Sequence, residues 1–331
     1  MASNFLMVKL AANAPQPQTA TMSYTIHTKK PFFTEVHHIV DSQARKGLDN
    51  LPAGEDLEEA IHDIRKRCKK IRAAWRLVRD ELGDKEYKKR NRYYRDTARL
   101  ISDLRDATAI IEALDMLEER FGDTTYKSAF TEMRQALQKR RDEHLPETDN
   151  RPEVMAEVEK RLEQGIQRIH PIPLKFENWS KTVKSVTRTY ARAYRLYHDM
   201  KEEPSSDTMH QWRKRTKYLR YELRLLKKVW PAVFTPWRKQ LHKLSDWQGD
   251  HHDLHELKSV MRGMAEVSPD TRRTLMALAT QHQEYCYAMA MPLGKRLYAE
   301  KPRHFAKRLK QYLRAWGKEP DKPVRIQVGF Q

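Results

Sequence analysis

One basic motif occurs twice in this 331-residue chain, first from His62 and again from His210. Both copies follow the pattern His-x-x-Arg-Lys-Arg-x-Lys-x-x-Arg. Around each copy, apolar residues recur at alternating steps of three and four, which is the pattern of one face of an amphipathic α-helix. This apolar stripe runs from Leu57 to Val78 in the first copy and from Met209 to Trp230 in the second. The chain must therefore fold so that each of two basic helices buries one face.

A second stripe, made of cations, lies directly beside the apolar stripe of each helix. Each cationic stripe is about 25 Å long, because a helix rises about 1.5 Å per residue. Residues 62–79 include eight Lys or Arg and one acid, and residues 210–227 include seven and one, so neither stripe has enough acidic partners of its own. The stripes consist of His62, Arg65, Lys69, Arg72, Arg76 and Arg79 and, in the second copy, of His210, Arg213, Lys217, Arg220, Arg224 and Lys227.

A single basic run on a helix is ordinarily a solvated surface, but a solvated face has no reason to recur in the same register. A cation beside a buried face loses solvation and needs an anion. Arg and Lys both suit phosphate oxygens, so the two rows predict a long, phosphate-rich partner. The other motif cations lie further round each helix and rank lower, because we expect them to face outward. They are Lys66 and Lys214, which we keep in the candidate site, and Arg67 and Arg215.

The repeated motif, with a Ser-Asp-x-x-x-Asp element after each copy, resembles the CHAD family, the conserved histidine α-helical domain. The elements are Ser102 to Asp106 and, with one more residue, Ser245 to Asp250. The similarity covers about residues 30–316, including a closing Leu-Tyr-Ala-Glu-Lys-Pro segment before a last basic helix. The resemblance implies two pseudo-symmetric antiparallel helical bundles around a basic central groove. It also implies binding of inorganic polyphosphate, often on intracellular polyphosphate granules, without an established catalytic activity.

Composition fits several polyanions equally well. The net charge of +19 and the pI near 9.8 favour binding to nucleic acid, an anionic membrane or polyphosphate. Glycine is scarce, and neither a dinucleotide-binding nor a P-loop motif is present. Cys68 and Cys286 fit small buried hydrophobes in a reducing compartment better than a disulfide. No segment approaches the roughly 18 apolar residues that span a bilayer, so we expect a cytoplasmic protein without membrane partners.

Helical periodicity and turn residues predict an all-α chain with an internal duplication. We expect a flexible leader at 1–30, a CHAD-like domain at 31–318 and a tail at 319–331. Within the domain, the first half covers 31–145, a linker helix 146–173 and the second half 174–318. The expected helices lie near 32–48, 55–81, 85–120, 123–144, 153–169, 176–200, 206–229, 234–263 and 270–290.

The helix ahead of the second motif carries a further cationic row. Its members Arg188, Arg192 and Arg195 are spaced at three or four residues and could face the first stripe across a groove. The corresponding helix of the first half is poor in cations, so the two halves need not contribute equally.

Histidine chemistry is open from sequence alone. His62 and His210 could donate to phosphate, act as acid or base, bind metal or serve the structure. We favour a hydrogen bond to phosphate or to an acid such as Asp106 or Asp250, and protonation would tighten binding at mildly acidic pH. His251 is one of a helical i, i+4 histidine pair, but no third ligand accompanies it. The sequence therefore predicts no metal site and no cofactor, although divalent ions could arrive with the polyanion.

Catalysis is the weaker hypothesis. The sequence has no nucleophile elbow, no ordered triad and no Glu-x-Glu-x-Lys strand, so we predict no catalytic residue and no enzyme. Nucleic-acid binding is the alternative function, because Tyr93, Tyr94, Tyr218 and Tyr221 interleave with basic residues. The last two flank an apolar stripe and are expected to pack in the core. The purpose of binding, the preferred chain length and the oligomeric state stay open.

Overall fold

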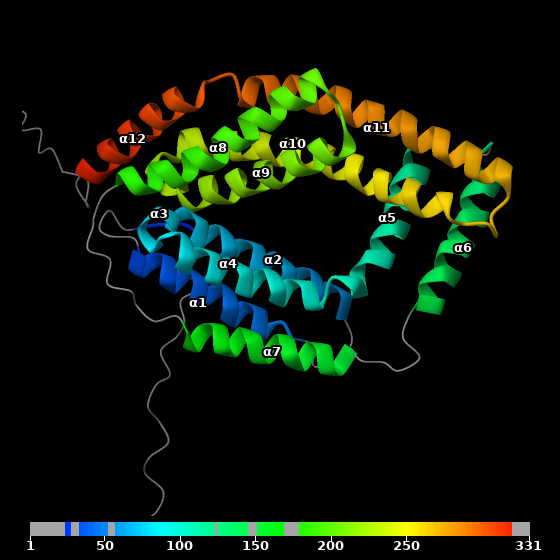
Figure 1. The fold of residues 1–331 in the computed structure, drawn as a ribbon, viewed down its shortest axis with the longest axis horizontal. Coiled ribbons are helices and arrows are strands. Elements are labelled where there is room, and N and C mark those ends of the chain that lie inside the picture. The colour runs from blue at the N-terminus through cyan, green and yellow to red at the C-terminus, as the bar shows by residue number, and fades with distance from the viewer. Residues whose placement is uncertain are drawn as a thin grey trace, which may run out of the picture.

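Every regular element in the described part of the chain is a helix, as predicted (Figure 1). A computed structural model describes residues 24–27, 33–51, 57–122, 125–144, 151–168 and 179–319. The helices are α1 (Phe33–Asp49), α2 (Leu57–Leu77), α3 (Arg79–Leu82), α4 (Asp84–Leu100), α5 (Asp103–Phe121), α6 (Lys127–His144), α7 (Arg151–Gln167), α8 (Trp179–Glu202), α9 (Ser206–Leu225), α10 (Pro231–Arg262), α11 (Pro269–Leu297) and α12 (Pro302–Lys318), with a 3₁₀ turn at Lys227–Val229.

These helices form two lobes and a distal arm (Figure 1). Helices α1, α2, α4 and α7 pack together as the first lobe, and α8 to α12 form the second. The arm consists of α5 and α6, which leave the first lobe and pack against the far ends of α10 and α11. A separate apolar cluster, including Leu114, Phe130 and Leu257, holds this arm in place. The arm therefore forms a third side beside the two lobes.

The two motif helices meet at the junction of the lobes. Ile64, Ile71 and Trp75 of α2 are buried, as are Trp212 and Leu219 of α9, and all belong to one apolar core that both lobes share. Helix α2 packs against α9 and α8. The predicted apolar stripes are thus the surfaces that build the core, and the cationic stripes beside them are brought to the lobe junction.

The apolar stripe of the second motif helix includes one residue that is only weakly apolar, Thr216, and its hydroxyl has a polar partner. Thr216 is fully buried, and its hydroxyl lies 3.3 Å from the Tyr298 hydroxyl, which is also buried. Tyr298 belongs to the closing segment before α12. A buried hydroxyl costs stability unless it is hydrogen-bonded, so this pair explains how a threonine is tolerated on an apolar stripe.

The expected helix at 85–120 is wrong as a single element, because it breaks at Ile101 and Ser102. Arg65 of α2 donates through Nη1 to the Ser102 carbonyl at 3.2 Å and to the Ile101 carbonyl at 3.5 Å. Carbonyls at a helix end lack intrahelical partners, so the motif arginine satisfies them. The break lets α5 turn toward α10, whereas α10 itself runs unbroken from Pro231 to Arg262.

Part of the expected leader belongs to the core. Tyr24 and Ile26 are buried, the Tyr24 hydroxyl donates to the Lys70 carbonyl at 2.8 Å, and the Ile26 amide donates to the Leu225 carbonyl at 2.8 Å. Residues 24–27 therefore connect α2 to α9, and the leader prediction is wrong for them; the rest of 1–30, and the tail beyond Glu319, lie outside the described residues. The expected linker helix occurs as α7 and packs on α1 and α4.

Candidate functional site

Cations from both motif helices line a cavity of about 940 Å³ where the lobes meet the arm. Helix α2 contributes His62, Arg65, Lys66 and Lys69. Helix α9 contributes Arg213, Lys217, Arg220 and Tyr221. The arm and α10 add Glu112, Arg140, Arg141, His252, Asp253 and Glu256. Seven of the predicted site residues are thus brought together in this space, which we call the large cavity.

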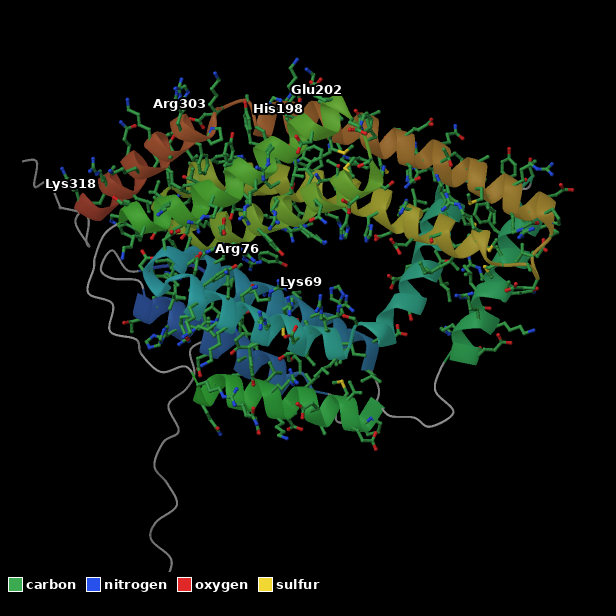
Figure 2. The ribbon with its side chains drawn as sticks, in the orientation of Figure 1. Lys69, Arg76, His198, Glu202, Arg303 and Lys318 are labelled. Atoms are coloured by element: carbon green, nitrogen blue, oxygen red, sulfur yellow. The ribbon has the colours of Figure 1, made fainter. Side chains whose placement is uncertain are left out.

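A smaller cavity of about 110 Å³ lies toward α3 and α8. Its lining includes the predicted Arg72, Arg76, Arg79, Arg188 and Arg192, and also Tyr87, Asn91, Arg215 and Tyr218. Both Lys69 and Arg76 lie on the side of α2 that faces the second lobe (Figure 2). The cationic stripe of α2 therefore supplies both cavities, its first half the large one and its second half the small one.

The α9 stripe behaves differently. At 3.6 residues per turn, Arg213, Lys217 and Arg220 share one side of α9, whereas Arg215 and Tyr218 lie on the opposite side. The first group lines the large cavity and the second group the small one. The two cavities therefore lie on the two sides of the contact between α2 and α9. Periodicity assigned one stripe per helix, but the packing of α2 across α9 uses two sides of α9.

Lys217 lies where the charges are most crowded. Burial, followed by the nearby Arg213, Lys69 and Arg220, lowers the pKa of Lys217 to about 7. These neighbours come from both motif helices, so the predicted facing of α2 and α9 cations exists at this point. A bound anion would reverse the effect and hold Lys217 in its charged form.

Arg213 packs closely against α10 at Gly249, a residue without a side chain. A Cβ atom at Gly249 would lie only 2.9 Å from Arg213 Nη2, so glycine leaves room for the guanidinium. The Nε of Arg213 is buried without a hydrogen-bond partner among the described residues. The same is true of Arg76 Nη1, Arg188 Nη1 and Arg215 Nε. Buried charged donors are costly to leave unpaired, and all four of these arginines line one of the two cavities.

The wall of the small cavity stacks arginine on tyrosine. The Arg76 guanidinium lies 3.6 Å from the centre of the Tyr218 ring, and Arg215 lies 5.5 Å from it. Arg76, Arg72 and Arg215 lower the Tyr218 pKa against the opposing effect of burial. Both Tyr218 and Tyr221 are half-buried and line a cavity, and Tyr221 also packs against the shared core, as expected.

One carboxyl group lies beneath this wall. Glu222 is fully buried and accepts a hydrogen bond from the Thr189 hydroxyl at 3.0 Å. Burial raises the pKa of Glu222 to about 8, although Arg76 opposes the rise. The single acid of residues 210–227 is therefore a core residue and does not neutralise the α9 stripe.

Other cations at this end already have carboxylate partners from α3 and α4. Arg188 Nη2 lies 2.9 Å from Asp80 Oδ1, and the Ser185 hydroxyl donates to Asp80 Oδ2 at 2.8 Å. Arg79 pairs with Asp84 at 2.9 Å. In the further cationic row of α8, Arg188 is thus bound to the first lobe in the free protein.

Several predicted residues line neither cavity. They are Arg195, His210, Lys214, Arg224 and Lys227. Arg224 instead lies 5.5 Å from the ring of Tyr24. Two residues expected to face outward, Lys66 and Arg215, do line a cavity, whereas Arg67 pairs with Asp63 at 2.8 Å. A side chain that points round the helix can still reach a cavity when a second helix crosses there.

His210 and His252 form a packed pair. Their ring centres lie 3.9 Å apart, and of the two only His252 lines the large cavity. Burial and then Lys214 and Arg213 lower the His210 pKa to about 4, and burial and then His210 lower that of His252 to about 3. Both rings are therefore neutral near pH 7. The preferred acid partner of His62, Asp106, has a side chain outside those described.

In the described residues, no group of three or more His, Cys, Asp or Glu side chains is arranged to hold a metal ion. His251 is buried, and burial lowers its pKa to about 4. Nor does any helix of the described chain have the length and apolarity needed to cross a membrane.

Sequence reasoning missed Arg140 and Arg141 of α6, His252 of α10, and Asn91 of α4. Asn91 accepts a hydrogen bond from Arg72 Nε at 3.0 Å and so orients a predicted ligand-binding cation. No periodicity could have found the α6 arginines, because α6 reaches the cavity only through the packing of the arm on α10 and α11.

The comparison with known families agrees with this arrangement. The model of the CHAD domain matches residues 38–262, which is more than half of the chain and includes both motif helices. No curated protein shows significant sequence similarity to the chain. With the all-α fold and the duplicated basic motif, this match shows that the chain belongs to the CHAD domain family.

Proposed function

We propose that the protein binds inorganic polyphosphate, with the large cavity as the principal site. The family is associated with polyphosphate binding or with triphosphate-tunnel proteins. The observation that carries the proposal is the convergence of Lys69 with Arg213 and Lys217, cations from both lobes, in one cavity. Their mutual repulsion is unfavourable in the free protein, so a polyanion that enters between them is stabilised by both lobes at once.

Two features favour polyphosphate over nucleic acid. The cationic surface is a cavity enclosed by the two lobes and the arm, which suits a thin chain without bases. The ring of Tyr218 lies 3.6 Å from the Arg76 guanidinium and lines a cavity of only about 110 Å³, which leaves too little space for a base to stack there. The alternative function, in which nucleic acid binds the same basic helices, is the competing hypothesis for the experiment below.

The role that we infer is binding rather than catalysis. The groups that meet in the large cavity are mainly permanent cations, which hold phosphate oxygens without forming covalent bonds to them. We further propose that the protein is cytoplasmic and associates with polyphosphate granules, since a protein that binds the polymer would concentrate where the polymer accumulates.

The first test is a competition titration at near-physiological salt. Labelled long-chain polyphosphate is bound, and duplex DNA, single-stranded RNA and short phosphates are added as competitors at equal phosphate concentration. The double substitution Lys69→Glu with Lys217→Glu should weaken polyphosphate binding by at least about a hundredfold, because two attractive contacts become repulsive. Displacement by nucleic acid at equal phosphate concentration would instead indicate a general polyanion surface.

A matched control keeps the change in net charge the same. Arg303 and Lys307 are exposed on α12, and Arg303 lies on the outer side of the second lobe (Figure 2). Reversing both to Glu should reduce affinity only slightly, through the weaker long-range field. Equal losses in the two double variants would show that net charge, and not the large cavity, determines binding. Circular dichroism of both variants verifies that the helices are retained.

A further inference from the structure

A second sizeable cavity lies outside the polyphosphate site, between α4 and α7 of the first lobe. Its volume is about 930 Å³, which is within the range of small-molecule sites. Helix α4 supplies most of its lining, α7 supplies Arg161 and Gly165, the residue after α7 is Arg168, and α2 supplies Trp75. The proposed polyphosphate binding uses none of these residues.

The deep part of this cavity is aromatic. Trp75 and Tyr94 are almost fully buried, and Tyr93 beside them is half-buried. Two planar guanidinium groups face these rings, that of Arg90 at 4.5 Å from the centre of Trp75 and that of Arg168 at 5.4 Å from the centre of Tyr93. Aromatic rings and guanidinium planes are the surfaces on which a nucleobase stacks. The floor therefore suits a flat, aromatic ligand.

Two hydrogen-bond donors at this floor have no partner. Both Trp75 Nε1 and the Tyr94 hydroxyl are buried, and neither is hydrogen-bonded within the described chain. Tyr94 packs tightly against α7, since a Cβ at Gly165 would lie 2.6 Å from its hydroxyl oxygen. Buried donors in folded proteins nearly always have an acceptor. A ligand with ring nitrogens or oxygens could supply one at either position.

The mouth of the cavity is cationic and not neutralised. The acids that line it already have partners: Glu86 pairs with Arg90 at 2.7 Å, Asp84 with Arg79 at 2.9 Å and Asp96 with Arg95 at 2.8 Å. By contrast, four lining cations of α4 have no carboxylate within salt-bridge distance among the described residues. These cations are Lys85, Lys88, Lys89 and Arg92. They form an exposed edge suited to phosphate groups.

From this arrangement we propose a second ligand site, for a compact phosphorylated ligand with an aromatic ring, of which a nucleoside triphosphate is the best example. The ring enters the aromatic floor between α4 and α7, and the phosphate groups lie against the lysines of α4. This geometry differs from that of the large cavity, whose walls are rows of cations and which therefore suits a ligand that is charged along its whole length. Long polyphosphate lacks the aromatic body that the floor of the second site requires.

The test measures binding of ATP by calorimetry in the Lys69→Glu, Lys217→Glu background, which removes competition from the large cavity. Adenosine and inorganic triphosphate are the comparison probes. We expect ATP to bind at least about tenfold more tightly than either, because only ATP fills both the floor and the mouth. Triphosphate binding as tightly as ATP, or no ATP binding at millimolar concentration, would overturn the proposal.

Two sets of variants locate the site. In the same background, Lys88→Glu with Lys89→Glu should weaken ATP binding by about tenfold or more, while in the otherwise native chain this pair should leave polyphosphate affinity nearly unchanged. Tyr93→Leu should weaken ATP but not triphosphate, and Tyr93→Phe, which keeps the ring, should preserve ATP binding. If Tyr93→Phe and Tyr93→Leu behave alike, stacking is absent and the proposal fails.

Discussion

At the scale of single residues, the candidate site contains cations whose charged form is disfavoured by burial and by neighbouring cations. Lys217 shows this most clearly, since burial and three neighbouring cations lower its pKa to about 7. Of the groups that face it, Asp253 acts in the opposite direction, but the net effect is the loss of a proton near neutral pH. Under the proposed function, a phosphate ligand adds to the countercharge of Asp253 and holds Lys217 in its charged form.

Polyphosphate affinity should fall as the pH rises above about 7. Below that pH, Lys217 is already charged in the free protein and binding requires no proton. Above it, binding must protonate Lys217, which costs up to about tenfold in affinity per pH unit. Titrations between pH 6 and pH 9 measure the slope. Lys217→Arg should flatten it, because arginine stays charged throughout this range.

The pH profile also separates lysine from histidine. The pKa of His210 is about 4, so this ring is already neutral across the same interval. We expect His210→Asn to leave the slope intact. If the dependence of affinity on pH disappears in His210→Asn and persists in Lys217→Arg, histidine and not Lys217 causes it, as the sequence analysis expected.

At the scale of elements, residues 24–27 connect the two motif helices, α2 and α9. Tyr24 and Ile26 insert between α2 and α9, and their hydrogen bonds to the Lys70 and Leu225 carbonyls connect one lobe to the other. Leu225 is the last residue of α9, so its carbonyl lacks an intrahelical partner and the Ile26 amide supplies one. This short segment therefore links the two motif helices directly at the lobe junction.

Ile26→Ala should lower the free energy of unfolding by about 2–4 kcal/mol, since the side chain is 1% exposed and its removal leaves a cavity in the shared core. Urea denaturation followed by circular dichroism measures the loss. An alanine at exposed Arg303 should change stability by less than about 0.5 kcal/mol. An Ile26 variant as stable as that control would mean that the segment is not part of the core in solution.

At the scale of the whole molecule, a net charge of +19 acts over a longer range than any one contact. It attracts every polyanion, and salt screens this attraction over about 8–10 Å. The two lobes and the arm place cations of α2, α6 and α9 around the large cavity. Under the proposed function, the net charge accelerates association, and the cavity determines which cations contact a bound chain.

Salt dependence should distinguish these contributions. The logarithm of polyphosphate affinity should fall linearly with the logarithm of salt concentration, as counterions are released. Arg213→Gln should reduce the slope by about one unit, because one phosphate contact is removed. Arg303→Gln, on the outer face, should leave the slope unchanged. Equal slopes for Arg213→Gln and the native protein would place Arg213 outside the contact.

The sequence by itself determined the all-helical class and the basic character of the candidate site. Apolar residues at helical spacing predicted the buried faces of α2 and α9, because burial follows periodicity when each helix has one apolar stripe. The repeated cations predicted a basic site, and the convergence of Lys69, Arg213 and Lys217 agrees with that prediction. The match of the CHAD domain confirms the family that the duplicated motif indicated.

Only the tertiary structure decided which cations share a cavity. The residues of one helix do not reveal where a neighbouring helix packs. Arg215 therefore lines the small cavity and the α6 arginines line the large one, although neither was expected to, whereas Arg224 lines neither cavity. At the break after α4, Arg65 of α2 caps the free carbonyls, and Ile26 is buried in the core that both lobes share. These outcomes depend on contacts between residues far apart in the chain, and local periodicity carries no information about such contacts.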